Sequence, residues 1–380
     1  ALPAAAVGLV ALASAVAAPS DPERPVPAGT VRVLRSPCQG AAAGDPGCGD
    51  AEGLRTATSG RVLLAVWRTS GDLLASVAPP TGAARTLRVA TITGETEGRP
   101  GGSAATAAPG GGFLVGWTSG DELRLARVAT DGAVRRVPGV RPGPTSPGVA
   151  VEPGRASARE LALTATWRGY VAFAVGRIPD GTGDAGLGGT GGGGSRIALR
   201  VLALDRDLRP RGPWRTVRGP VPYALADAAT TADGRAAVGV GSGAVRTTVS
   251  VPAGGGTPRI EADRVLVPGP GGARVERLPG ARELPVGRVR PQLDGVVRDA
   301  RGAQRSSWTA TAPRSDAVPA RVRQQWLLGP GPGTPDRPLA DGLLESRPVA
   351  TPDGVVLVGL RPTGPRRSDD VEVVLVRPPR

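Results

Sequence analysis

A block of sequence occurs twice in the first third of the chain, and this duplication restricts the fold more than any other feature. The first copy begins at Gly60 and runs through the apolar segment Val62-Leu-Leu-Ala-Val-Trp67 into a Ser-Gly-Asp turn and a second apolar segment. The second copy begins at Gly112 and repeats this order, with Trp117 standing 50 positions after Trp67. A period of this size, built from short apolar strands and turns, predicts a β-propeller blade or a similar β repeat.

The same template divides residues 51–380 into six repeats. Their anchors, each at the end of the second strand of a repeat, are Trp67, Trp117, Ala174, Val240, Trp308 and Leu360. The second repeat can be divided into four strands, with an Asp131-Gly132 hairpin turn between the last two. We therefore predict an all-β fold, a β-propeller of about six four-stranded blades. An extra hairpin would fit between Val265 and Val289, so a propeller of seven blades remains an alternative.

The sixth repeat ends at Arg380 one strand short of a full blade. Residues Thr30–Arg35 alternate like a strand and precede the first repeat without belonging to one. Propellers protect their open edges by closing the ring. We expect Thr30–Arg35 to pair with Val371–Val376 and to close the ring in this way.

The N-terminal residues predict export. Residues 1–18 are apolar and end in an Ala15-Val-Ala17 pattern typical of signal-peptide cleavage, with an uncleaved membrane anchor as the alternative. A Pro-rich linker follows at 19–29, and the propeller domain spans 30–380, with the closing strand and a cysteine loop in 30–50. Cys38 and Cys48 suit a small disulfide in an oxidising compartment, so we expect a secreted or extracytoplasmic protein.

The net charge of +14 could indicate a polyanionic partner, but the composition has a simpler explanation. The chain lacks Lys, Asn, Met and His, and it is rich in Ala, Gly, Pro and Arg, as a bacterium with a high-GC genome would encode. The arginines are scattered, and six Trp, two Tyr and two Phe are few for base stacking. We do not expect nucleic-acid binding. We expect a monomer whose partner is a protein or a glycan, with membrane contact only through residues 1–18 if they are retained.

The strand–Trp–Ser-Gly-Asp block, together with the Asp-Gly hairpin of the second repeat, resembles secreted bacterial β-propeller repeat proteins. This resemblance covers two repeats well and Asp50 to Arg380 loosely. It implies a closed ring of four-stranded blades, with ligands bound at the mouth of the central channel. It does not imply one activity. The chain contains neither the WD40 signature nor the Ser-x-Asp-x-Gly-x-Thr-Trp boxes of sialidases.

Several catalytic chemistries are excluded by the missing residue types. Without His there is no Ser-His-Asp or Cys-His arrangement, and without Lys there is no Schiff base. The segment Gly181–Gly186 matches a dinucleotide-binding pattern formally but is not followed by a helix pattern, so we interpret it as a Gly-rich loop. We predict no cofactor and no catalytic residue, with calcium at Asp180 and Asp184 kept as an alternative.

Acidic residues recur in the turn between the second and third strands of five repeats, and arginines accompany some of them. These turns lie on the face of a propeller that also receives the links between blades. The candidate ligand-binding residues are Asp72, Asp121, Asp180, Asp184, Arg314, Asp316, Arg366, Arg367, Asp369 and Asp370. The alternative is that Asp serves only as a turn residue. We therefore predict a binding or interaction module with its ligand at this mouth. The alternative is an extracytoplasmic carbohydrate-active hydrolase or lyase that uses carboxylates on the same scaffold.

Overall fold

The computed structural model describes the greater part of the chain. It covers residues 30–35, 51–69, 71–92, 102–119, 122–140, 158–179, 195–217, 224–242, 245–269, 271–277, 291–315, 318–329, 338–362 and 371–378. These residues form strands and turns, and no helix occurs among them. Over the same residues there is accordingly no helical segment with the length and apolarity needed to cross a membrane. Cys38 and Cys48 lie outside the described residues, so the disulfide stays a prediction.

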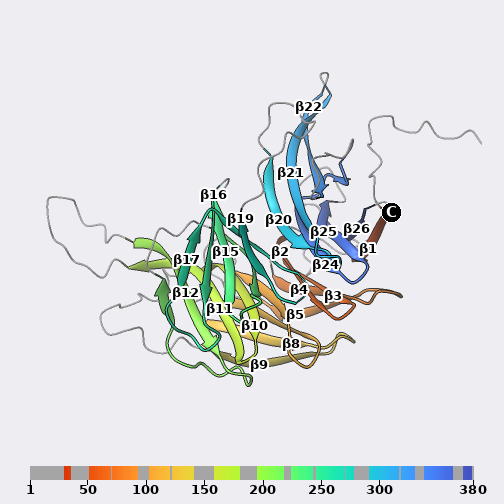
Figure 1. Ribbon diagram of the computed structural model, residues 1–380. Helices are drawn as coiled ribbons and strands as arrows, with labels where there is room; N and C mark the ends of the chain where they lie inside the picture. The colour runs from red at the N-terminus through yellow and green to blue at the C-terminus, as the bar shows by residue number, and fades with distance from the viewer. Residues whose placement is uncertain are drawn as a thin grey trace, which may run out of the picture.

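Six four-stranded antiparallel sheets stand around a common axis (Figure 1). From the axis outwards, the first three blades are β2 (Glu52–Ser59), β3 (Val62–Arg68), β4 (Asp72–Ala78), β5 (Arg85–Thr91); β6 (Ser103–Ala107), β7 (Phe113–Ser119), β8 (Glu122–Val128), β9 (Val134–Val140); and β10 (Ala158–Thr166), β11 (Gly169–Pro179), β12 (Ser195–Leu204), β13 (Arg215–Val217). The last three are β14 (Ala224–Thr230), β15 (Ala236–Ser242), β16 (Val245–Val251), β17 (Arg259–Ala262); β20 (Gln292–Arg298), β21 (Gln304–Ser315), β22 (Val318–Leu328), β23 (Ala340–Asp341); and β24 (Glu345–Thr351), β25 (Gly354–Pro362), β26 (Val371–Arg377), β1 (Thr30–Arg35). The predicted six-bladed propeller is confirmed.

The N-terminal strand completes the sixth blade. β1 pairs antiparallel with β26, from Thr30 opposite Arg377 to Arg35 opposite Val373. The sheet order β24–β25–β26–β1 therefore joins the two ends of the described chain in one blade. The predicted closure is confirmed, and it leaves no blade with a missing outer strand.

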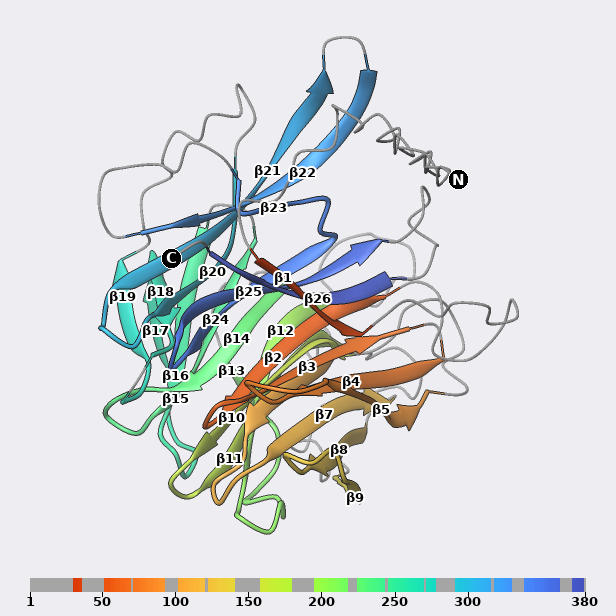
Figure 2. The same ribbon diagram turned by 90° about the vertical axis from the view of Figure 1, so that its right-hand side faces the viewer.

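An extra hairpin lies between the fourth and fifth blades. It consists of β18 (Arg264–Val267) and β19 (Arg274–Arg277), and β18 packs against both β16 and β20. Its two strands form a sheet of their own, so the hairpin predicted between Val265 and Val289 exists but is not a seventh blade. In the fifth blade, β21 and β22 are unusually long and project beyond the ring (Figure 2).

The core consists of apolar layers between neighbouring blades. In β3, Leu63, Ala65 and Trp67 pack against the sixth blade, whereas Leu64 and Val66 pack against the second blade. Both faces of this strand are therefore covered, and this explains why its sequence is a continuous apolar run rather than an alternating one. Trp67 is fully buried. The tryptophans at the repeat anchors thus pack between blades, as expected for large apolar residues.

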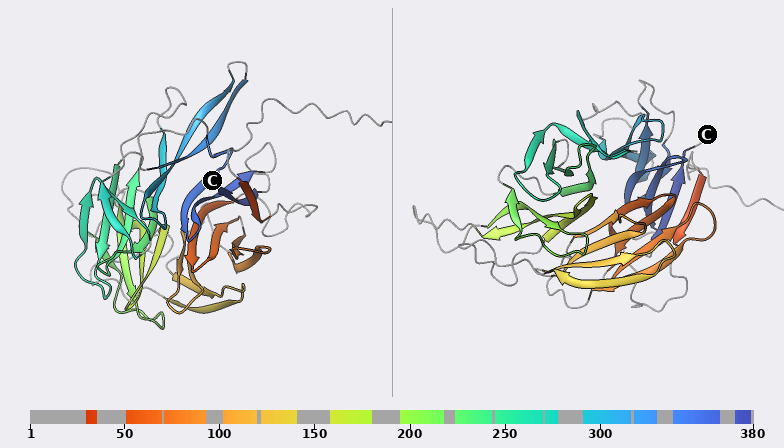
Figure 3. Two further views of the ribbon diagram at one scale, coloured as in Figure 1. Left: turned by 45° about the vertical axis from the view of Figure 1, so that its right-hand side comes forward. Right: turned by 60° about the horizontal axis from the view of Figure 1, so that its bottom comes forward.

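The topology gives the ring two distinct faces. Each blade is an antiparallel meander that starts at the axis, so every inner strand begins on the face where the link from the preceding blade arrives. We call this the link face, and it also carries the turns between second and third strands. The opposite face carries the turns between first and second strands and between third and fourth strands. Figure 3 shows the blades arranged around the axis.

Candidate functional site

Charged side chains from the inner strands gather around the axis, close to the link face. We call them the charged ring, and its members are Arg55 on β2, Glu160 on β10, Asp227 on β14, Asp294 on β20, and Glu345 and Arg347 on β24. Each lies within the first four residues of its strand, which places all of them at the same end of the axis. Five of the six blades contribute. Arg55 is buried, and the other five are half-buried.

β-Bulges occur in the inner strands at the positions of four of these residues. The pairing register shifts between Glu52 and Arg55, between Ala158 and Glu160, between Leu225 and Ala228, and between Leu293 and Gly295. A bulge places an extra residue in one strand and changes the direction of the neighbouring side chains. The bulges therefore provide the local geometry by which these strands turn a charged side chain towards the axis while their apolar residues remain between the blades.

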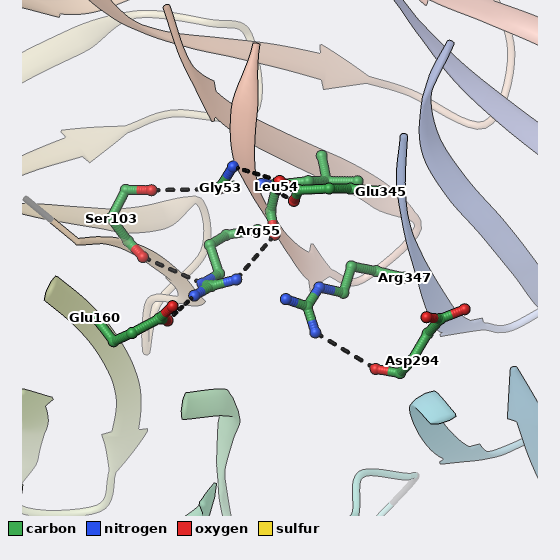
Figure 4. A network of polar contacts seen from close by, with 8 residues as sticks. All are labelled: Gly53, Leu54, Arg55, Ser103, Glu160, Asp294, Glu345 and Arg347. Atoms are coloured by element: carbon green, nitrogen blue, oxygen red, sulfur yellow. Dashed lines mark hydrogen bonds and ion pairs between the residues drawn. The ribbon is translucent and has the colours of Figure 1, made fainter. Parts of the chain in front are cut away.

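Arg55 joins three blades. Its Nη2 forms an ion pair with Oε2 of Glu160 at 2.7 Å, and its Nε donates to the carbonyl oxygen of Ser103 at 3.2 Å (Figure 4). Its Nη1 donates to the carbonyl oxygen of Leu54 at 3.2 Å. A buried guanidinium is stable only when its charge and its donors are matched in this way. Arg55 therefore fixes the positions of the first three inner strands relative to one another.

Close backbone contact beside this pair depends on a glycine. A Cβ atom at Gly102, just before β6, would lie 2.3 Å from the backbone nitrogen of Leu161 and 2.6 Å from the carbonyl carbon of Glu160. No side chain fits at that distance, so Gly102 allows β6 to approach β10 where Glu160 meets Arg55.

Glu345 connects the sixth blade to the first. Its Oε1 accepts from the backbone N–H of Gly53 at 2.9 Å, and its Oε2 accepts from the N–H of Leu54 at 2.8 Å. These two N–H groups belong to the bulged segment of β2, where the regular ladder is interrupted. The carboxylate satisfies donors that the bulge would otherwise leave unpaired.

Asp294 is held by hydroxyl groups. Its Oδ2 accepts from Oγ1 of Thr309 at 2.7 Å, from Oγ of Ser346 at 3.1 Å and from Oγ of Ser307 at 3.4 Å. Burial raises the pKa of the Asp294 carboxyl, and this outweighs the lowering by the three hydroxyl groups and by the charge of Arg347. Asp294 thus keeps its proton to a higher pH than an ordinary aspartate does.

Arg347 extends from β24 towards the centre of the ring (Figure 4). Its Nη1 donates to the main-chain oxygen of Asp294 at 3.4 Å. Burial acts to lower the pKa of Arg347, but the negative charges of Asp227, Glu345, Asp294 and Glu160 outweigh it and raise the pKa. Arg347 is therefore a permanent cation surrounded by the four carboxyl groups of the ring.

The charged ring has the properties of a site for a polar ligand. Two guanidinium groups face four carboxyl groups, so the ring is negative although the whole chain is strongly positive. Asp227 forms no hydrogen bond or ion pair within the described part of the chain. Its carboxylate oxygens and the remaining donors of Arg347 can bind further groups. No group of three or more His, Cys, Asp or Glu within the described residues is placed to hold a metal ion.

The candidate residues on the second-to-third-strand turns have a different setting. Asp72, at the start of β4, is fully buried, and its Oδ2 lies 3.2 Å from Nε of Arg88. Arg314 lies in β21. The other candidates lie outside the described residues, namely Asp121, Asp180, Asp184, Asp316, Arg366, Arg367, Asp369 and Asp370. Ligand binding by these turns, and calcium at Asp180 and Asp184, therefore stay predictions.

Sequence reasoning missed the charged ring, although a local signal for it exists. Asp227 and Asp294 are single charged residues among small or apolar neighbours, in Leu225-Ala-Asp-Ala-Ala229 and Leu293-Asp-Gly-Val-Val297. An isolated acid inside a strand of this kind indicates a bulge or an inward-facing polar position.

No family model matches the chain, and no curated protein matches it significantly. Solved structures with a similar fold include the hemagglutinin-neuraminidase of parainfluenza virus 5, at 10% identity and a TM-score of 0.47, with 92% of this chain and 94% of that one covered. The Trypanosoma rangeli sialidase, solved with sialic acid, is 12% identical at a TM-score of 0.46, covering 91% and 56% of the two chains. The α-L-arabinanase of Penicillium chrysogenum, solved with arabinobiose, is 13% identical at a TM-score of 0.45, covering 92% and 98%. At these identities and scores the likeness concerns the fold, and the chain is described as a six-bladed β-propeller without a family.

Proposed function

We propose that this propeller is an exported binding module that holds a neutral, hydroxyl-rich ligand, an oligosaccharide, in the charged ring at the link face. The observation that carries the proposal is the convergence of six charged side chains from five inner strands, four of them placed at β-bulges. Bringing like-charged carboxyl groups together around one guanidinium costs free energy through their mutual repulsion. Hydrogen bonds from a bound ligand to these carboxylates would offset that cost.

The chemistry of the ring favours hydroxyl groups. A sugar hydroxyl donates to a carboxylate and accepts from a guanidinium at the same time, and the ring offers both kinds of group. An anionic ligand would face four carboxyl groups, so its binding would be opposed by Coulomb repulsion. We also propose that Asp121 and Asp369, in the predicted turns between second and third strands, extend the site around its rim.

A glycan array tests the proposal with three proteins: the wild-type chain, Asp227→Asn and Arg61→Gln. Asp227→Asn keeps the size of the side chain and removes no hydrogen bond or ion pair within the described residues, only the charge near Arg347, so we expect its fold to be retained. Arg61 is an exposed arginine on the opposite face, paired with Asp353 at 2.9 Å, and it serves as the control. We expect neutral oligosaccharides to bind to the wild type and to Arg61→Gln, and to bind about tenfold more weakly to Asp227→Asn. Wild-type binding to no neutral glycan would contradict the proposal.

A carboxylate-based glycoside hydrolase is the second candidate, favoured by the raised pKa of Asp294. A carboxyl group that keeps its proton can act as a general acid, while a second carboxylate in the ring acts as base or nucleophile. Release of reducing ends from the glycans that bind would test this. We expect the activity to disappear in Asp294→Asn and to persist in Arg61→Gln. Binding without release of reducing ends would leave the binding module as the function.

A further inference from the structure

Trp167 is the most exposed large apolar side chain of the described residues, at 61% exposure. It lies in the two-residue turn between β10 and β11, on the face opposite the charged ring. Its indole rests against Gly234 in the β14–β15 turn of the next blade, where a Cβ atom would lie 3.4 Å from the indole nitrogen. One edge of the indole therefore contacts the neighbouring blade, while most of the residue remains exposed.

One arginine packs on this indole, and three more are linked to the same turn through main-chain carbonyl oxygens. The guanidinium carbon of Arg168 lies 4.4 Å from the centre of the Trp167 ring. Nη2 of Arg206 donates to the carbonyl oxygen of Trp167 at 2.9 Å, and Nη2 of Arg211 donates to that of Arg168 at 3.0 Å. Arg127, from the second blade, donates to the carbonyl oxygen of Arg206 at 3.0 Å. We call Trp167 and these four arginines the Trp167 cluster.

The positive charge of the Trp167 cluster is not neutralised by the described part of the chain. None of its four guanidinium groups forms an ion pair there. Of the acids in the neighbouring turns, Asp205 accepts from the backbone N–H of Arg209 at 2.8 Å and Asp233 accepts from the hydroxyl of Thr231. Asp207, exposed beside Arg206, is the one further acid of these turns, so the four arginines keep a net positive charge. The carbonyl hydrogen bonds orient the guanidinium groups but leave their charges and most of their donors free for an anion.

We propose that the Trp167 cluster binds an anionic polysaccharide, with the apolar face of one sugar ring on Trp167 and its carboxylate or sulfate group on the surrounding arginines. Carboxylates and sulfates match the planar donor geometry of guanidinium groups. A sugar residue that carries such a group supplies both contacts from one unit, and this fits a single aromatic side chain inside a compact group of arginines. The site is independent of the charged ring, because it lies on the opposite face and has the opposite charge.

The same observations disfavour nucleic acid and membrane. Binding of single-stranded nucleic acid uses a series of aromatic side chains on which successive bases stack, and here one indole is exposed. Anionic membranes attract broad basic surfaces, whereas this face also carries the acidic side chains of Asp207 and Asp353.

Binding of defined polyanions to the full chain tests the proposal. The probes are oligosaccharides of polygalacturonic acid and of chondroitin sulfate, with a neutral dextran oligosaccharide, a dT oligonucleotide and phosphatidylserine vesicles for comparison. We expect at least one acidic oligosaccharide to bind more tightly than the other three probes, with an affinity that falls as salt rises. Trp167→Ala and Arg206→Gln should each weaken this binding about tenfold, whereas Arg61→Gln, which removes the same charge on the same face, should not.

Three results would overturn the proposal: no binding of either acidic oligosaccharide, tighter binding of the oligonucleotide or of the vesicles, or equal effects of Arg206→Gln and Arg61→Gln. A second variant, Asp227→Asn, separates the two sites. It should leave acidic-oligosaccharide binding unchanged even where it weakens the neutral ligand of the charged ring, so each proposal can fail without the other.

Discussion

Arginine has two opposite settings in this propeller. In the charged ring, Arg55 is buried, paired with Glu160 and bonded to two carbonyl oxygens of neighbouring strands. In the Trp167 cluster, Arg206 and Arg211 are exposed, and within the described residues their side chains bond to carbonyl oxygens alone. An excess of arginine in the sequence therefore does not describe the charge of any one site. The axis is negative, and the excess positive charge lies elsewhere.

Among substitutions of charged residues, truncation of the buried Arg55 should have the largest effect on stability. Arg55→Ala leaves the Glu160 carboxylate without its ion-pair partner, so we expect the free energy of unfolding to fall by about 3 kcal/mol. Arg206→Ala removes an exposed hydrogen bond to a carbonyl oxygen, and we expect it to cost less than about 1 kcal/mol. Urea denaturation of both variants measures the difference. Equal losses of stability would contradict the claim that the buried, ion-paired Arg55 stabilises the fold more than the exposed Arg206 does.

Removal of Glu345 should have the next largest effect. Glu345→Ala leaves the N–H groups of Gly53 and Leu54 without their acceptor in the bulged segment of β2. An unsatisfied buried donor costs roughly 1–3 kcal/mol, and water can reach this half-buried site, so we expect a loss of about 2 kcal/mol. Glu345→Gln retains one acceptor oxygen and should lose less. A loss in Glu345→Gln as large as that in Glu345→Ala would show that the hydrogen bonds to β2 are not what matters.

The buried carboxyl groups of the fifth blade should make stability depend on pH. Burial raises the pKa of Asp294, and burial raises that of Asp341, on the outer strand β23, to about 6. A raised pKa means that the folded state binds more protons than the unfolded state above pH 3.8, so these groups lower stability as pH rises. For Asp341 the decrease falls between about pH 4 and 6.

Substitution of either aspartate by asparagine should remove its contribution to the decrease in stability with rising pH. We expect Asp341→Asn to gain stability relative to the wild type as the pH is raised from 4 to 7, and Asp294→Asn to change in the same direction. Thermal denaturation at a series of pH values provides the test, with Asp353→Asn, at an exposed site, as the control. A stability difference that does not vary with pH would show that the carboxyl group of the variant site titrates normally in the folded protein.

Removal of the exposed indole should have the smallest effect on the fold. Trp167→Ala loses the contact with Arg168 and little else, so we expect the free energy of unfolding to change by less than about 1 kcal/mol. Trp67→Ala is the matched comparison, because Trp67 is fully buried between the first and sixth blades and its truncation should cost about 3–5 kcal/mol. Similar losses in the two variants would show that Trp167 supports the fold rather than a surface site.

Much of the fold could be predicted from the sequence because its determinants are local. The apolar run ending at Trp67, the Ser-Gly-Asp turn and the Asp131-Gly132 hairpin each define strand and turn within about ten residues. Closure by Thr30–Arg35 followed from counting strands in the last repeat. These features depend on period and turn chemistry, and both can be read without knowing the tertiary structure.

The charged ring could not be predicted, for two physical reasons. Arg55 and Glu160 are 105 positions apart, and the sequence does not show that two inner strands bring them together. The register shifts beside them also change which side chains face the axis, and a simple alternation of inward and outward residues does not anticipate a bulge. Acids in turns recur at corresponding positions of the repeats, whereas single acids inside strands do not form a pattern in the sequence. The predicted binding residues therefore lie in the turns at the rim and not on the inner strands at the axis.

The most direct test of the central proposal is a crystal structure of the chain with the neutral oligosaccharide that binds best on the array. We expect ligand density at the axis near the link face, with sugar hydroxyls within hydrogen-bond distance of Asp227 and Arg347. The same crystals of Asp227→Asn should show weaker density at that position. Density only at the Trp167 cluster, or on the outer strands, would contradict the assignment of the charged ring as the binding site.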